Sequence, residues 1–159
     1  MKKIFYFILV SLVGTAILTS CAKKADQPSA HDEFVASLTS ADTTEVLNMC
    51  QEFFTKLSQG DKAGAIGMLS LSDSLGAVLP MTEEKSQQLT KQFSLFPVLD
   101  NHLISYTFGS AADNLMKFKV VFAKDEDGKE EAINFGLNPI RKDGKWYLTV
   151  RNAAGKVAL

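Results

Sequence analysis

Residues 116–137 read MKFKVVFAKDEDGKEEAINFGL and carry the pattern that decides the fold. Large apolar residues occupy every second position on both sides of a polar centre. Such alternation is typical of two half-buried strands joined by a hairpin. A two-residue type I′ turn at Asp127-Gly128 would place Val120 opposite Phe135, with the neighbouring pairs following in the same register.

Two further stretches, residues 104–108 and 146–150, alternate in the same way. The four stretches together predict a bent four-stranded antiparallel sheet. One face is apolar and buried (the dry face), and the other is mostly exposed to solvent (the wet face). Because each dry face must be buried against something, we expect the rest of the chain to supply a covering layer.

The turn before the last strand contains Asp143-Gly144. A three-residue loop with a left-handed Gly144 is favoured here, because it places Ile140 opposite Leu148 on the dry face. The preceding strand must then bulge at Asn138-Pro139, a position at which proline is tolerated. That bulge would bend the sheet.

The covering layer is predicted to be three helices that precede the sheet. The first begins at Thr43 or Thr44 and ends near Gly60. Its apolar stripe consists of Val46, Met49, Cys50, Phe53, Phe54 and Leu57. A shorter helix follows Asp61, and a third begins after Thr82. The expected fold class is therefore α+β, with N-terminal helices packed on the dry face of the sheet.

The first 21 residues differ in character from the rest. Lys2 and Lys3 precede an apolar run over residues 4–18, and small residues lead to Cys21. The segment resembles a bacterial lipoprotein signal, and this resemblance implies that residues 1–20 are removed and that Cys21 carries lipid, including palmitate. An ordinary signal peptide or a single membrane span is the alternative.

Lysines rather than an aspartate follow Cys21, which favours the outer membrane, on its periplasmic face. Residues 21–42 are expected to be a lipidated flexible tether, because they include few large apolar side chains. A short helix around residues 31–38 fits within it. Residues 43–159 form the predicted domain. Cys50 would then be the remaining thiol, which excludes an internal disulfide.

Removal of Lys2 and Lys3 with the leader leaves 15 basic against 18 acidic side chains. No basic stripe is present that could neutralise phosphates, so nucleic acid is not an expected partner. No set of His, Cys and carboxylate residues has the spacing of a metal site, and no cofactor motif is present. Neither a metal nor a cofactor is therefore predicted.

Two segments resemble the nuclear transport factor 2-like, or cystatin-like, superfamily and its small lipoprotein members. They are VLNMCQEFFTKLSQGD at residues 46–61 and DGKWYLTV at residues 143–150, and the likeness spans residues 43–151. The resemblance implies a cone between the first helix and the sheet. Its enzymes, such as ketosteroid isomerase, work in that cone with a tyrosine and acidic groups.

The inward positions of this chain do not match those of the enzymes. The lining of an apolar cavity is predicted to be Phe53, Tyr106, Phe118, Phe135 and Trp146. Only Tyr106 among them is polar, and a buried tyrosine is usually a core residue. His102, beside Asp100, is either half of an acid/base pair or a solvated histidine, and the second is favoured. His31 falls in the tether.

The predicted function is a non-catalytic binding or interaction module on a membrane-anchored protein. The partner is a small apolar ligand in the cone, or a second copy or another envelope protein on the outer face of the sheet. That face is predicted to present Lys117, Lys119, Tyr147 and Arg151, together with Val121 and Thr149. The alternative is a small isomerase- or cyclase-type enzyme acting on an apolar substrate.

Overall fold

The computed structural model describes residues 29–73 and 75–151, and the predicted leader and Cys21 lie outside them. The elements run in the order α1 (Ala30–Ser37), α2 (Ser40–Ser58), α3 (Lys62–Gly67), β1 (Leu69–Ser72), β2 (Val78–Leu79), α4 (Glu83–Leu95), β3 (Asp100–Phe108), β4 (Asn114–Lys124), β5 (Glu130–Lys142) and β6 (Lys145–Arg151). Within the described residues, no helix is both long and apolar enough to cross a membrane.

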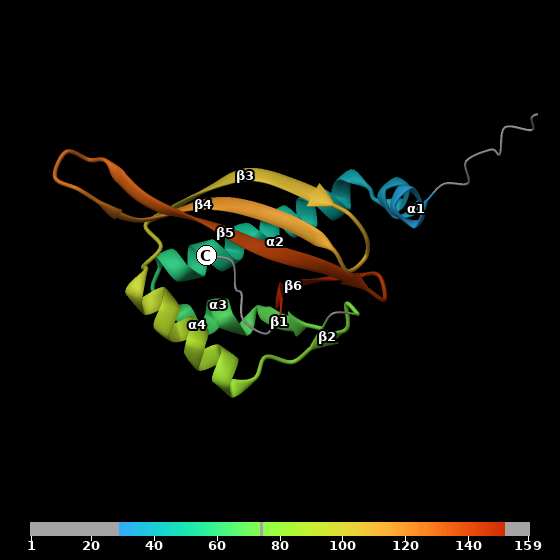
Figure 1. The fold of residues 1–159 in the computed structure, drawn as a ribbon, viewed down its shortest axis with the longest axis horizontal. Coiled ribbons are helices and arrows are strands. Elements are labelled where there is room, and N and C mark those ends of the chain that lie inside the picture. Colours follow the sequence, from blue (N-terminus) through green and yellow to red (C-terminus); the bar gives the residue numbers. More distant parts are fainter. Residues whose placement is uncertain (1–28, 74, 152–159) are drawn as a thin grey trace, which may run out of the picture.

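The sheet has six strands in the described chain, not the four expected. Their order is β2-β1-β6-β5-β4-β3, so that β3 forms one edge (Figure 1). The predicted meander β3-β4-β5-β6 is present. The two added strands come from residues 69–79, where β1 runs parallel to β6 and β2 pairs with β1. Strands of four and two residues are too short for alternation to reveal them.

Helix α2 begins earlier in the chain than expected, whereas α3 and α4 begin where predicted, after Asp61 and Thr82. Helix α2 starts at Ser40, where Thr39 and Asp42 form a capping box, rather than at Thr43 or Thr44. Helix α1 matches the short helix expected around residues 31–38, and Ser29 caps it with Asp32. Two helices thus occupy part of the segment expected to be a flexible tether. A capping box satisfies the free N–H groups of a first helical turn with polar side chains. Because it contains no apolar repeat, apolar periodicity does not predict a helix start of this kind.

The first hairpin is shifted by two residues from the predicted register. Phe118, not Val120, lies opposite Phe135, and an irregularity follows at Val121. The connection is longer than a two-residue turn, since β4 ends at Lys124 and β5 begins at Glu130. Within it, the Asp125 carboxylate accepts hydrogen bonds from the Asp127 and Lys129 N–H groups at 3.1 and 2.7 Å. A shift of two keeps the side chains from Met116 to Val121 on their predicted faces, so the alternation agrees with both registers there.

The second hairpin also differs from the prediction. Asp143 and Gly144 both have positive φ, of 51° and 75°, which makes a two-residue turn instead of the predicted three-residue loop. Ile140 consequently lies opposite Tyr147, and the pairing continues through Asn138 and Pro139 without a bulge.

Ile140 is nevertheless only 1% exposed, although it points away from the helices. The connection between β3 and β4 reaches this end of β5, where the Arg141 N–H donates to the Ala111 carbonyl at 2.7 Å. The side-chain amide of Asn138 donates to the Ala112 carbonyl at 3.3 Å. A neighbouring loop therefore covers the position that alternation marks as wet.

Candidate functional site

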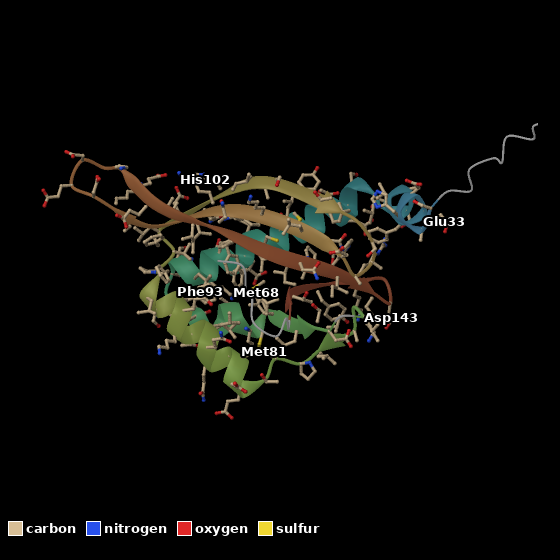
Figure 2. The ribbon with its side chains drawn as sticks, in the orientation of Figure 1. Glu33, Met68, Met81, Phe93, His102 and Asp143 are labelled. Carbon is tan, nitrogen blue, oxygen red and sulfur yellow. The ribbon has the colours of Figure 1, made fainter. Side chains whose placement is uncertain are left out.

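The interior between the helices and the sheet is filled by phenylalanine rings. Phe53 and Phe54 of α2 meet at 5.2 Å between ring centroids, and Phe54 meets Phe118 of β4 at 4.7 Å. Phe135 of β5 and Phe93 of α4 complete the group, with centroids 5.9 Å apart. Figure 2 shows Phe93 on the interior side of α4. Edge-to-face and tilted contacts of this kind add stability beyond the burial of area.

One hollow in this interior, among the described residues, is very small. A hollow between α4 and the sheet measures about 10 Å³ and is lined by Phe54, Gln92, Phe93, Phe96, Val98, Val120, Ile133 and Phe135. One water molecule needs about that volume, so the hollow is far smaller than an organic ligand. The amide nitrogen of Gln92 is buried without a hydrogen-bond partner.

Four of the five predicted cavity residues lie in this interior, but they pack rather than line a cavity. Phe53, Phe118, Phe135 and Trp146 are at most 5% exposed. Tyr106 does not belong to the interior, because it is 49% exposed on the edge strand β3. Its ring meets that of Phe108 at 5.8 Å between centroids, and alternation cannot show how much of an edge strand is covered.

In the described part of the chain, two titratable groups lie in or beside the interior, the Cys50 thiol and the Asp42 carboxylate, and each has a shifted pKa. Cys50 is fully buried in α2, and burial raises the pKa of its thiol to about 12. The thiol is therefore protonated at neutral pH and inert, as expected for a core cysteine. Asp42 is the one buried carboxylate among the described residues, and it lies at the rim of the core rather than inside it.

Asp42 joins the first turn of α2 to the C-terminal hairpin. Its carboxylate accepts hydrogen bonds from the Thr39 N–H and hydroxyl at 2.9 and 2.7 Å and from the Trp146 indole at 3.1 Å. The Arg141 guanidinium lies 3.2 Å away and also stacks over the Trp146 ring. The Thr39 hydrogen bonds, followed by that of Trp146, lower the pKa of Asp42 to about 2.

The outer face offers less free surface than predicted. Lys117, Lys119 and Tyr147 are half-buried. Thr149 is fully buried, and its hydroxyl donates to the Asn138 carbonyl at 2.6 Å. Val121 is fully buried as well. The side chain of Arg151 lies outside the described side chains.

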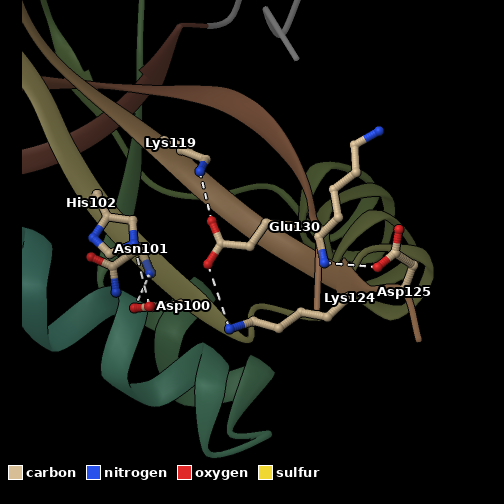
Figure 3. Close-up of polar contacts among 8 residues, drawn as sticks. Asp100, Asn101, His102, Lys119, Lys124, Asp125 and Glu130 are labelled. Carbon is tan, nitrogen blue, oxygen red and sulfur yellow. Dashed lines mark hydrogen bonds and ion pairs between the residues drawn. The ribbon is translucent and has the colours of Figure 1, made fainter. Parts of the chain in front are cut away.

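A polar cluster crosses three strands on this outer face (Figure 3). His102 of β3 lies opposite Lys119 of β4 in the register, and its Nε2 atom is 3.3 Å from the Asp100 carboxylate. Glu130 of β5 accepts a hydrogen bond from Lys119 at 2.7 Å and lies 3.5 Å from Lys124. These contacts lower the pKa of Glu130, chiefly through the Lys119 hydrogen bond.

For His102, a solvated histidine was the favoured prediction, and an acid/base pair with Asp100 was the alternative. His102 is exposed, as favoured, but it lies within a strand and beside Glu130 as well as Asp100. Glu130 was missed because it comes from a different hairpin, and only the pairing of β3, β4 and β5 brings it near. His31, expected in the tether, lies in α1 with its Nδ1 atom 2.8 Å from the Gly109 carbonyl.

Large apolar side chains lie exposed along the β3 edge. Leu103, Ile104 and Tyr106 are 41%, 50% and 49% exposed, and Leu115 of β4 is 47% exposed beside them. The register of β3 shifts around Ile104, which is the irregular position of this strand. An edge strand of nine residues with free backbone groups is a surface that can accept another strand.

Comparisons with known proteins found one similar solved structure and no similar family model or curated protein. No protein-family model matches the chain, and no curated protein matches it. Among solved structures, a Campylobacter jejuni protein described as an NTF2-like transpeptidase matches with 19% identity and a TM-score of 0.38. The match covers 65% of this chain and 95% of that chain. A likeness of this strength assigns neither a family nor an activity.

Proposed function

We propose that the chain is a lipid-anchored protein of the bacterial cell envelope, held through Cys21 at the periplasmic face of the outer membrane. Its domain is a nuclear transport factor 2-like module without catalytic activity, which binds a partner protein through the β3 edge. The anchor rests on the charge, length and final cysteine of the leader. The binding surface rests on the exposed apolar side chains of β3.

The filled interior supports binding at the surface rather than inside a cone. An apolar ligand would need several hundred Å³ of enclosed space, as small-molecule sites usually have. The hollow beside Phe93 and Phe135 offers about 10 Å³. A guest could enter only by displacing packed aromatic rings, and packed interiors resist this displacement.

The β3 edge supports a protein partner. Strand addition satisfies the free N–H and C=O groups of an edge, and exposed side chains on either side of the strand add apolar contact. Ile104 and Tyr106 provide this contact at the centre of β3. The opposite edge, β2, has only two residues and is poorly suited to the same role.

The anchor is tested by Cys21→Ala. Because attachment of a diacylglyceryl group to the Cys21 sulfur starts the anchoring, this variant should lose radiolabelled palmitate and leave the outer-membrane fraction. Cys50→Ala is the matched control, since it removes the other cysteine and should keep both properties. Palmitate incorporation and density-gradient fractionation measure the outcome. A Cys21→Ala protein that remains labelled and membrane-bound contradicts the anchor.

The binding edge is tested by photo-crosslinking in cells. A photoreactive phenylalanine analogue replaces Tyr106 in one strain and Leu79 of the other edge strand in a second strain. We expect a defined protein adduct from position 106 and little from position 79, because β3 is the longer of the two sheet edges in the described part of the chain. The adduct mass distinguishes a second copy of this chain from another envelope protein. Absence of an adduct at position 106 contradicts the proposed edge.

A further inference from the structure

Asp100, His102 and Glu130 bring three metal-binding side chains together on the outer face. One donor atom from each lies within 4.8 Å of the others. Two residues come from β3 and one from β5, with β4 between them. The set combines one imidazole with two carboxylates, all of which are ligands that Zn²⁺ accepts.

The distances are close to those of a tetrahedral site. Zinc bonds of about 2.0–2.1 Å place neighbouring tetrahedral donors about 3.3 Å apart. The Nε2 atom of His102 and the Oδ2 atom of Asp100 are already 3.3 Å apart. Glu130 must approach by about 1.5 Å, which a change in its side-chain torsions provides. A fourth position is then open to water, because His102 and Asp100 are exposed.

Two lysines compete with a metal for Glu130. The Nζ atom of Lys119 is 2.7 Å and that of Lys124 is 3.5 Å from the carboxylate oxygens. The two lysine side chains are 43% and 49% exposed, and their flexible stems allow the ammonium groups to turn into solvent. Solvent-exposed ion pairs contribute little to stability, so a cation that binds three ligands at once can displace them.

We propose that Asp100, His102 and Glu130 form a Zn²⁺ site that joins β3 to β5 across β4. The ion would fasten the free edge strand to the long central hairpin on the side opposite the helices. This site goes beyond the proposed function and does not depend on it, because the ligands face away from the interior and the metal needs neither the anchor nor a partner.

The test is Zn²⁺ titration of the full-length chain, without a histidine tag, followed by calorimetry and by competition with a chromophoric chelator. We expect saturable binding of one ion. His102→Ala should weaken binding at least about tenfold, since imidazole is the strongest of the three ligands for zinc. His31→Ala removes the other histidine of the chain and should leave the affinity unchanged.

Lys119→Met is expected to change the Zn²⁺ affinity in the opposite direction to His102→Ala. It removes the ammonium group that competes for Glu130 and should tighten Zn²⁺ binding several-fold, whereas Glu130→Gln should weaken it. All these side chains are partly or largely exposed, and circular dichroism checks that each variant is folded. The proposal is overturned if wild type shows no saturable binding up to about 1 mM, if His102→Ala binds like wild type, or if Lys119→Met binds more weakly.

Discussion

Phe135→Ala is expected to lower the free energy of unfolding by about 3–5 kcal/mol, the usual cost of removing an aromatic ring from a packed core. The Phe135 ring contacts Phe53, Phe54 and Phe93 at centroid distances of 6.1, 6.0 and 5.9 Å. Because α2 and α4 both meet β5 at this ring, the neighbours cannot close the space without moving two helices. Equilibrium unfolding in urea measures the loss.

Phe122→Ala is the matched control for this substitution. Phe122 is half-buried at the margin of the sheet, where its ring packs against Phe96 at 5.2 Å. Its loss should cost about 1–2 kcal/mol, because less apolar area leaves water there. Benzene should raise the melting temperature of Phe135→Ala but not of wild type, since only the variant has an enclosed apolar hole. Equal losses in the two variants would contradict the central role of Phe135.

Asp42→Ala is expected to cost about 3 kcal/mol, the second large effect. The variant loses the N-cap interaction of α2 and leaves the Trp146 indole and the Arg141 guanidinium without their shared acceptor. Asp32→Ala is the control, because Asp32 forms the same capping box with Ser29 on the exposed helix α1. Its removal should cost no more than about 1 kcal/mol. Similar losses in both variants would show that the contacts with the hairpin contribute nothing.

The Asp42 contacts also predict how stability depends on pH. The pKa of Asp42 is about 2 in the folded chain against an ordinary value of 3.8. A lowered carboxyl pKa stabilises the fold above the unfolded value, and this stabilisation disappears as pH falls from about 5 to 2. The contribution is about 2 kcal/mol, given 1.36 kcal/mol per pKa unit. Asp42→Asn should lose this part of the acid sensitivity, and unfolding curves measured across that pH range detect the change.

The amino-acid sequence predicted the class of the fold and most of its interior. Phe53 and Phe54 recur at helical spacing, while Phe118 and Phe135 alternate with polar residues, and all four are buried as expected. These predictions succeed because they require only the periodicity of each element and the need to bury its apolar side. Tyr106 shows the limit of such reasoning, since its periodicity points inward but its side chain is 49% exposed on an edge strand.

The polar sites could not be predicted in the same way. Asp42 was assigned to the tether, yet it contacts Trp146, 104 residues away. Glu130 lies close to the predicted hairpin turn in the sequence, yet it joins His102 and Asp100 on another strand. Contacts of this kind depend on strand order and on where helix ends meet the sheet, neither of which leaves a periodic signal in the chain.

The sequence by itself therefore determined most of the core side chains, which elements carry them and that the architecture is α+β. Only the tertiary structure decided the six-strand order, the register of the hairpins and the partners of Asp42 and Glu130. The physical reason is that a strand can shift by two residues without exposing any apolar side chain. Turn geometry and long-range packing choose among these alternatives, and both depend on residues far apart in the chain.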